Sequence, residues 1–388
     1  MNKVKKTNLK GRKLRRKKKK YSMKSIDYGL LCGIFLLLFV GIVMVYSSSS
    51  YYALYHKNSN FNSHFYFIKE IIWAIAGIIG MSITMSLDYH IYKKWTPWLV
   101  IITLLFLVAV LFIGANINGA SRWIRLGPLS FQPSELAKYV VVLYLALLID
   151  KRKDKITKFG EGTLFYLGLA GIFALLILLQ KNLSITAIVM MVACVMVYVG
   201  GAKFIHLFSL LPVGAGLLGA LIWYEPYRLK RFTSFLNPWA DTTQDSYQLI
   251  QSFYALGSGG IFGVGLGNSR QKALFMPEPH NDFIFAIIGE ELGLIGCIAI
   301  ICIFLFIIFR GVSIAVQARD NYGFLLAIGI ISVISIQAII NIAVVSGSMP
   351  VTGVPLPFIS YGGTSLVFNL GAVGILLNIS RQTKEEEL

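Results

Sequence analysis

The apolar stretch LLCGIFLLLFVGIVMV occupies residues 30–45, and IAIICIFLFIIF occupies residues 298–309. Neither contains a charged side chain, and many similar stretches follow along the chain. A helix needs about 20 largely apolar residues to cross a hydrocarbon core of about 30 Å. These stretches therefore predict an all-α polytopic membrane protein.

The composition excludes a single soluble core. Of the 388 residues, 56% are hydrophobic and 14% are charged, and the mean hydropathy is +0.69. A soluble domain carries roughly 25% charged residues. Hydropathy instead predicts about ten spans, near residues 28–47, 67–87, 96–114, 134–150, 162–180, 184–200, 204–224, 283–309, 323–345 and 362–380.

The charge distribution orients these spans. Residues 1–24 contain thirteen Lys and Arg and no acid, and removing them from the net charge of +18 leaves +5. A basic run directly before a first apolar span predicts a cytoplasmic N-terminus rather than nucleic-acid binding, so we expect no nucleic-acid partner. Ten spans return the C-terminus to the cytoplasm, and the basic residues at 93–94, 151–158 and 203 fall in loops predicted to be cytoplasmic. The predicted regions are a basic tail (1–25), a transmembrane domain (26–382) and a short cytoplasmic tail (383–388).

The loops predicted on the outer side are polar, aromatic and unequal in length, at residues 48–66, 115–133, 225–282 and 346–361. In the longest, which joins the seventh and eighth spans, apolar residues recur at helical spacing from Tyr247 to Tyr254. They follow cap candidates at 241–243, which predicts an interfacial amphipathic helix. Three prolines in 346–361 favour a re-entrant or tightly folded hairpin, which a membrane tolerates only where protein covers it.

Ionisable side chains at the rim of a span are costly, so each is a candidate functional residue. Arg122 and Arg125 precede the segment Gln132-Pro-Ser-Glu-Leu-Ala-Lys138. Within it, Glu135 and Lys138 lie three residues apart and share one helix face. The alternative interpretation is an internal Glu–Lys pair that only neutralises itself.

Asp282 lies at the outer end of a long apolar span. One interpretation is a helix N-cap, which would lower the pKa of its carboxyl, whereas burial in a pocket would raise it. His280 is the other candidate base, although for a lone histidine we favour an orienting role. Glu290 follows eight residues later, about 12 Å along a helix axis. That is too far for a catalytic carboxylate pair, so Glu290 and Glu291 are interpreted as structural.

Glu135 and Asp282 both begin spans that run from outside to inside, so both are expected at the outer face. Arg122, Arg270 and Lys272 lie in outer loops at the same level. Cations stabilise a departing phosphate, and a carboxylate can accept a proton from an attacking hydroxyl. This combination suits an anionic, lipid-linked substrate.

Four ordered motifs carry a resemblance. They are Asn118-Gly-Ala-Ser-Arg-Trp-Ile124, Phe131-Gln-Pro-Ser-Glu-Leu-Ala-Lys138, Pro277-Glu-Pro-His-Asn-Asp-Phe-Ile-Phe285 with Gly289-Glu-Glu-Leu-Gly293, and Pro350-Val-Thr-Gly-Val-Pro-Leu-Pro-Phe-Ile-Ser-Tyr-Gly-Gly363. Together they strongly resemble the SEDS family of FtsW, RodA and SpoVE, across roughly residues 25–382. The compact stretch 263–272 looks more like FtsW or SpoVE than RodA.

The resemblance implies a peptidoglycan glycosyltransferase of the bacterial cytoplasmic membrane, at the division septum if it is FtsW-like. Such an enzyme would polymerise lipid II at the outer face, with undecaprenyl pyrophosphate as leaving group. A class B penicillin-binding protein and other division-complex membrane proteins are the implied partners. The family's essential Asp maps onto Asp282, its paired acid and base onto Glu135 and Lys138, and its loop Arg onto Arg122. Arg270 and His280 complete the predicted substrate-binding residues.

The chain departs from the family pattern at two places. Residues 180–186, Gln-Lys-Asn-Leu-Ser-Ile-Thr, lack the Pro, Asp and Gly of the usual Gln-Pro-Asp-x-Gly-Thr. The family pattern therefore does not define the hairpin there. The usual His-Thr-Asp reads His280-Asn281-Asp282, which exchanges one polar residue for another.

Two other functions stay open from the sequence. A transporter that flips lipid II would use buried polar residues such as Glu290, Glu291, Asn341 and Asn369 as its path. A non-catalytic division scaffold would use the outer loops as a docking surface. A divalent cation also stays open, because acidic sites that act on pyrophosphates often use one, but the sequence contains no evident ligand cluster.

Overall fold

The computed structural model describes residues 25–55, 59, 61–117, 120–126, 129–240, 246–273 and 275–382. Nearly all of the predicted basic tail, the cap candidates at 241–243 and the tail 383–388 lie outside these residues. The helices are α1 (Tyr28–Tyr55), α2 (Phe65–Ser86), α3 (Ile91–Ile113), α4 (Pro133–Lys151), α5 (Phe165–Leu179), α6 (Leu183–Val199), α7 (Phe204–Tyr224), α8 (Pro226–Leu236), α9 (Tyr247–Gly259), α10 (Ile284–Gln317), α11 (Asn321–Val345) and α12 (Thr364–Ser380).

The long helices follow the predicted spans. The first seven helices and the last three, α10–α12, occupy the ten apolar segments, and a π-helical turn at Phe159–Leu164 leads into α5. Seven described helices are individually long and apolar enough to cross a membrane, while α6 and α12 are shorter apolar helices. The prediction of a polytopic helical membrane protein is confirmed.

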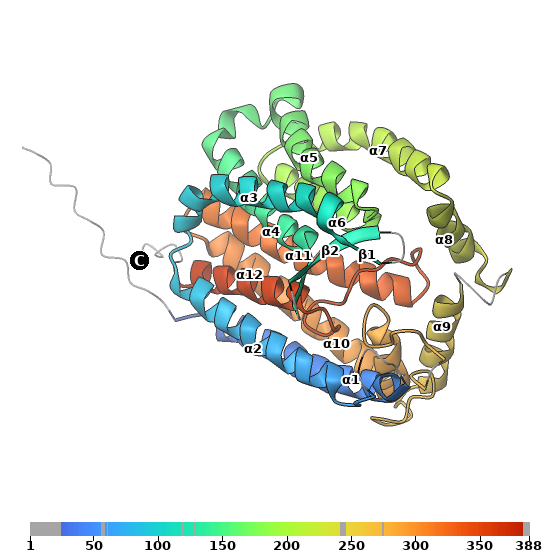
Figure 1. The fold of residues 1–388 in the computed structure, drawn as a ribbon. Helices are drawn as coiled ribbons and strands as arrows, with labels where there is room; N and C mark the ends of the chain where they lie inside the picture. Colours follow the sequence, from blue (N-terminus) through green and yellow to red (C-terminus); the bar gives the residue numbers. More distant parts are fainter. Residues whose placement is uncertain are drawn as a thin grey trace, which may run out of the picture.

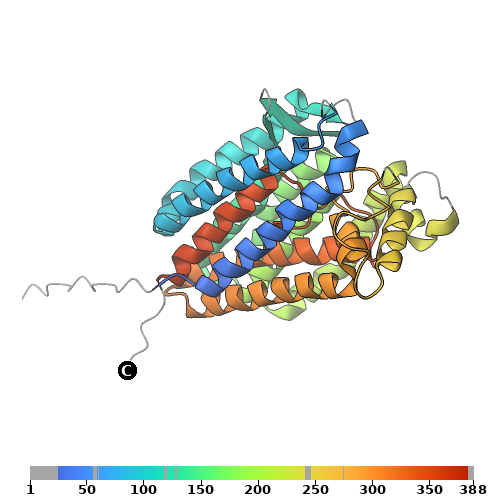
Figure 2. The ribbon, with the colours of Figure 1, turned by 90° about the horizontal axis from the view of Figure 1, so that it is seen from below.

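The start of α1 and the end of α12 lie at one end of the bundle, which we call the inner end (Figure 2). The backbone N–H of Asp27 donates to the hydroxyl of Ser380 over 3.2 Å. The guanidinium of Arg310, on α10, pairs with the Asp27 carboxylate over 2.6 Å. Both ends of the described chain are therefore fixed to the same side, as an even number of spans requires.

The bundle is built around α4 and α11, which lie among the other helices (Figure 1). Their side chains are buried along most of their length. Beside them α2 runs along α12 at close range. A side chain at Gly374 would come within 2.3 Å of the Met81 carbonyl oxygen, so only glycine fits there. The hydroxyl of Thr84 donates to the Gly371 carbonyl over 2.8 Å. Small residues and hydroxyl groups of this kind let membrane helices approach closely.

At the opposite, outer end lies a small antiparallel sheet of β1 (Ala115–Ile117), β2 (Ala120–Leu126) and β3 (Leu129–Phe131), in the order β1-β2-β3. It occupies a loop for which the sequence predicted no regular structure. The sheet is the one β element among the described residues of a chain that is otherwise helical.

Two further helices lie at the outer end (Figures 1 and 2). The helix predicted from the spacing of Tyr247 to Tyr254 is confirmed as α9, and its buried face packs on α10 and α11. The Ser252 hydroxyl donates to the Val345 carbonyl over 3.1 Å. The basic helix α8, which was not predicted, begins with Pro226 in its first turn. It follows α7, a helix with no buried residue that lies at the periphery of the bundle (Figure 1).

Candidate functional site

Asp282 lies in the last turn of the outer loop before α10. The N-cap of α10 is Phe283, and this position makes no side-chain capping bond. The interpretation of Asp282 as an N-cap is therefore wrong. The side-chain amide of Asn341, on α11, donates instead to the backbone carbonyls of Asp282 over 2.7 Å and Val354 over 2.8 Å. Asn341 thus fixes the Asp282 backbone next to the proline-rich segment 346–361.

The Asp282 carboxyl is half-buried, and a side chain at Gly353 would come within 3.4 Å of its Oδ2 atom. No ion pair within 4.0 Å reaches this carboxyl from the described part of the chain. Burial raises its pKa to about 7, and the negative charge of Glu278 adds to this rise. The positive charges of Arg231 and Arg122 oppose it. A carboxyl near neutrality can both hold and release a proton under physiological conditions.

Arg122 lies on β2 and is held by a neighbouring hairpin. Its Nε atom donates to the Gln180 carbonyl over 3.3 Å, and its Nη2 atom donates to the Lys181 carbonyl over 2.5 Å. The hairpin turns at Lys181, whose φ of 60° is left-handed, and Asn182 caps α6 by accepting from the Ile185 N–H over 3.3 Å. A tight turn therefore forms there without the family's Pro, Asp and Gly, and its carbonyls orient the guanidinium.

Arg231, on α8, is a basic residue of the site that the sequence reasoning missed. Its Nη1 atom donates to the Val351 carbonyl over 3.2 Å, in the same segment that passes Asp282. Arg228 lies one turn earlier and donates to the Leu221 carbonyl over 3.0 Å. The sequence does contain a signal for α8, because three basic residues at 228–231 stand on the side that the positive-inside rule leaves poor in Lys and Arg.

Glu135 and Lys138 form a buried ion pair in the first turns of α4. Lys138 Nζ lies 2.9 Å from Glu135 Oε2, and the two side chains are only 1% and 2% exposed. Lys138 also donates to Gln337 Oε1 over 2.8 Å, and Gln337 Nε2 donates to the Pro355 carbonyl over 3.1 Å. The pair therefore supports the segment that borders Asp282. The charge of the Lys138 ammonium is already balanced by Glu135.

The segment 346–361 folds tightly and is covered by protein, as its prolines predicted. Val354, Leu356 and Phe358 are among its buried side chains. The Tyr361 N–H donates to the His280 carbonyl over 3.0 Å, which joins this segment to the residues before Asp282.

The His280 ring is buried in a cage of three tyrosines. Its centroid lies 4.2 Å from that of Tyr66, 5.4 Å from that of Tyr52 and 5.6 Å from that of Tyr361. Only 1% of His280 is exposed. This packing suits a residue that orients the Asp282 segment.

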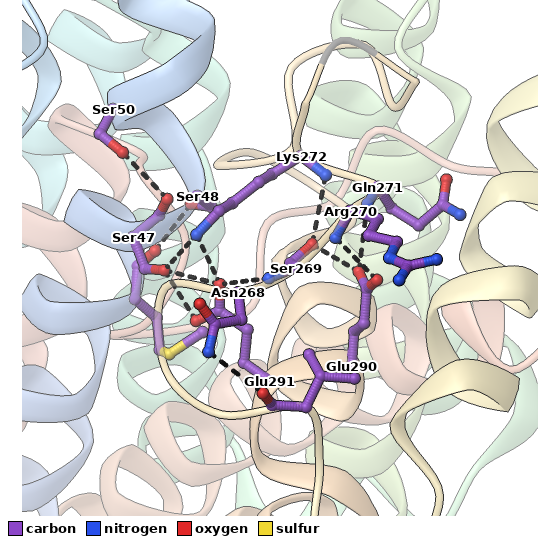
Figure 3. A network of polar contacts seen from close by, with 12 residues as sticks. Ser47, Ser48, Ser50, Asn268, Ser269, Arg270, Gln271, Lys272, Glu290 and Glu291 are labelled. Carbon is purple, nitrogen blue, oxygen red and sulfur yellow. Dashed lines mark hydrogen bonds and ion pairs between the residues drawn. The ribbon is translucent and has the colours of Figure 1, made fainter.

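Lys272 belongs to a second buried network, next to α1 (Figure 3). Its Nζ atom lies 2.7 Å from Glu291 Oε1 and donates to the Ser47 hydroxyl over 3.0 Å. The Ser47 hydroxyl in turn lies 2.7 Å from each Glu291 oxygen. Glu291, which is fully buried on α10, therefore ties the outer loop to α1.

The carboxylate of Glu290 accepts hydrogen bonds from the same loop, including one from its backbone (Figure 3). The N–H of Arg270 donates to Glu290 Oε1 over 2.9 Å, and the Ser269 hydroxyl bonds to Oε2. The Arg270 side chain itself is exposed. Glu290 and Glu291 are thus satisfied in the way that a structural role requires, and Arg270 and Lys272 accompany them. Neither cation is among the charges that shift the pKa of Asp282.

Metal ligands do not cluster in the described ranges: no group of three or more His, Cys, Asp or Glu there could hold an ion.

Comparison with known proteins identifies the family. The family model of FtsW, RodA and SpoVE, described as "Cell cycle protein", matches residues 28–385. The chain belongs to this family. It is 42% identical to the probable peptidoglycan glycosyltransferase FtsW of Geobacter sp. (strain M18), over 89% of the chain and 94% of that relative. It is 43% identical to the stage V sporulation protein E of Bacillus subtilis (strain 168), over 93% of the chain and 98% of that relative.

Solved structures share the fold. A chain from a peptidoglycan synthase complex, described as coordinating polymerization and crosslinking, superposes with a TM-score of 0.75 at 25% identity. The match covers 93% of this chain and 99% of that one. The rod shape determining protein RodA of Thermus thermophilus gives a TM-score of 0.69 at 25% identity, covering 93% and 98% of the two chains.

Proposed function

We propose that the chain is a peptidoglycan glycosyltransferase that polymerises lipid II into glycan strands. The observation that carries this proposal is Asp282, a half-buried carboxyl whose pKa is raised to about 7 at the outer end of the bundle. Relatives that are 41–42% identical are named peptidoglycan glycosyltransferases, and the matched solved chain comes from a peptidoglycan synthase complex.

In the proposed reaction Asp282 acts as general base. It takes the proton from the acceptor sugar hydroxyl as that oxygen attacks the anomeric carbon of the donor. The bond from that carbon to undecaprenyl pyrophosphate breaks, and the leaving group departs with its electron pair. A base whose pKa lies near the working pH combines a large deprotonated fraction with a useful driving force for proton transfer.

Arg122 and Arg231 are proposed to stabilise the negative charge that develops on the pyrophosphate. Both guanidinium groups act electrostatically on Asp282, and backbone carbonyls hold both in place. Fixed cations stabilise such charge without reorganising during the reaction. Lys138 acts through the segment that it supports, and Arg270 and His280 have indirect roles.

The proposed setting is the outer face of the cytoplasmic membrane, at the division septum for an FtsW-like member. The proposed partner is a class B penicillin-binding protein that crosslinks the strands, alongside other membrane proteins of the division complex. The matched synthase complex couples polymerization to crosslinking, which supports a partner of this kind.

The polar groups that a flippase would use have structural partners. Asn341 binds two backbone carbonyls, and Asn369 Oδ1 accepts from the Tyr139 hydroxyl over 2.5 Å. Glu290 and Glu291 are occupied by the outer loop and α1. Among these four described residues, each side chain has a structural partner and only the Asn341 Oδ1 atom lacks one, so the contacts favour the enzyme.

The test is the purified chain in vesicles with lipid II, with and without a class B penicillin-binding protein. We expect glycan strands from the wild-type chain. A parallel assay of fluorescent lipid II flipping should show no transport. Flipping without any polymerisation would contradict the proposal.

A further inference from the structure

The loop at residues 261–266 carries an exposed apolar surface between α9 and the site. Its exposed side chains are Ile261 (60%), Phe262 (80%), Val264 (41%) and Leu266 (56%). No charged residue interrupts this stretch. Four large apolar side chains on one short loop are costly in water and mark a contact surface.

The loop lies at the depth of the outer leaflet. It packs on α10 at Gly293, where the helix is interrupted by a φ of 68°. Between Gly293 and Arg310, which pairs with Asp27 at the inner end, α10 rises about 25 Å at about 1.5 Å per residue. That is less than the hydrocarbon thickness of about 30 Å, so Gly293 and the loop beside it fall within the core.

The loop surface also continues the lipid-facing side of α10. Residues 284–291 of α10 are all buried. From Leu294 onward the helix exposes large apolar side chains, beginning with Leu294 (53%), Ile295 (52%) and Ile298 (50%). The exposed apolar loop therefore begins where the exposed face of α10 ends.

Backbone hydrogen-bonding groups of the loop have partners within the protein, as a hydrocarbon environment requires. The N–H groups of Val264 and Gly265 donate to the Glu290 and Glu291 carbonyls, which the helix break frees. In return, the N–H groups of Leu294 and Ile295 donate to the carbonyls of residues 260 and 261. Irregular backbone at membrane depth persists only where its polar groups find such partners.

Two carbonyls inside the loop are satisfied by one asparagine. The Asn268 side-chain amide donates to the Val264 carbonyl over 3.2 Å, and its backbone N–H donates to the Gly265 carbonyl over 3.2 Å. Gly263 can approach α10 because it has no side chain: a Cβ there would lie 2.2 Å from the Glu291 carbonyl oxygen. Its φ of 80° also requires glycine.

We propose that the 261–266 loop is inserted into the outer leaflet and contacts lipid acyl chains directly. It anchors the segment that carries Arg270, Lys272 and Asp282 at the depth where a lipid-linked substrate would be presented. The buried Lys272–Glu291 network lies on the protein side of this anchor. The inference does not depend on the reaction that the site performs.

The experiment places spin labels on the full chain in vesicles of phosphatidylethanolamine and phosphatidylglycerol. Cys32, Cys194 and Cys302 are replaced by serine, and Cys297, which is buried, is kept. Single cysteines are introduced as Phe262→Cys and Leu266→Cys in separate chains, and collision rates with molecular oxygen and with nickel ethylenediaminediacetate are measured. Each chain is first checked for a monodisperse elution profile.

The matched controls are Leu305→Cys, on the exposed face of α10 (58%), and Arg125→Cys, on the exposed side of β2. We expect labels at 262 and 266 to behave like the label at 305, with an oxygen-to-nickel ratio several-fold above that at 125. A ratio equal to that at 125 would place the loop in water and overturn the inference. Low collision rates with both reagents would mean that protein, such as a second copy, covers the loop, and would overturn it equally.

Discussion

Asp282 differs from an ordinary surface aspartate because its carboxyl is half-buried and no cation of the described residues forms an ion pair with it. Burial raises the pKa of its carboxyl to about 7 from an ordinary value of 3.8. The folded chain therefore retains a proton that the unfolded chain would release between about pH 4 and 7. The contribution of this carboxyl to stability is present below about pH 4 and decreases as the pH rises to about 7. The same ionisation generates the base, so the rise in pH that activates Asp282 also removes its contribution to stability.

The rate of lipid II polymerisation is expected to rise with pH through an apparent pKa near 7. Glu278→Gln removes a charge that raises the pKa of Asp282, so its profile should shift to lower pH. Arg231→Gln removes a charge that lowers this pKa, so its profile should shift to higher pH. Initial rates between pH 5 and 9 measure both shifts. If the two pH–rate profiles shift in the same direction, or if neither shifts, the assignment of Asp282 as the base is contradicted.

Arg122 is held by two carbonyls in a geometry that a lysine cannot reproduce. Arg122→Lys should therefore lower polymerisation by at least about tenfold, the equivalent of about 1.4 kcal/mol. The matched control is Arg125→Lys, three residues along β2, where the side chain is exposed and the rate should stay near that of the wild type. Equal losses in the two variants would show that positive charge on the sheet matters and that the position of Arg122 does not.

Among the elements, α4 shows what spacing alone can predict. The spacing of Glu135 and Lys138 predicted a shared helix face, and the structure pairs them over 2.9 Å. It also adds what spacing could not show, the contact with Gln337 on α11 and through it with Pro355. Those partners lie about 200 residues along the chain, where no local pattern connects them to α4.

Lys138→Met should destabilise the fold, because it leaves a buried carboxylate unpaired at a cost of about 3 kcal/mol or more. Lys155→Met is the matched control, since Lys155 and Glu161 form an exposed pair that should contribute little. Thermal unfolding in detergent, followed by tryptophan fluorescence, compares the two variants. A melting temperature for Lys138→Met equal to that of Lys155→Met would rule out a supporting role for the buried ion pair.

The irregular elements were the hardest to predict. Strands β1 and β3 have three residues each, and the basic helix α8 has no buried residue, so neither the sheet nor α8 produces a strong periodic signal. The interruption of α10 at Gly293 was equally hidden, because a single glycine inside a helical pattern is tolerated and does not by itself mark a break. Its cause is the pairing with residues 260–265, a contact made by tertiary structure.

At the scale of the whole molecule, hydropathy and charge predicted the ten spans and placed both termini at one end. The general position of the site followed, because Glu135 lies in the first turn of α4, Asp282 lies just before α10, and Arg122 lies on the sheet at the outer end of the bundle. Hydropathy and charge did not predict which of the charged residues lie together at the site. The positive charge of Arg231 acts on Asp282 from α8, whereas Arg270 and Lys272 lie with Glu290 and Glu291. Residues at one membrane level can belong to separate clusters, and only three-dimensional packing distinguishes them.

The measurement that tests the account most directly is lipid II polymerisation by the Asp282→Asn chain, purified in complex with a class B penicillin-binding protein. Asparagine keeps the size of the side chain and removes its ability to accept the proton. A general base contributes about 10²–10⁴-fold, so the rate should fall at least about 100-fold while elution and melting match the wild type. A folded Asp282→Asn chain that polymerises lipid II at the wild-type rate would contradict the account.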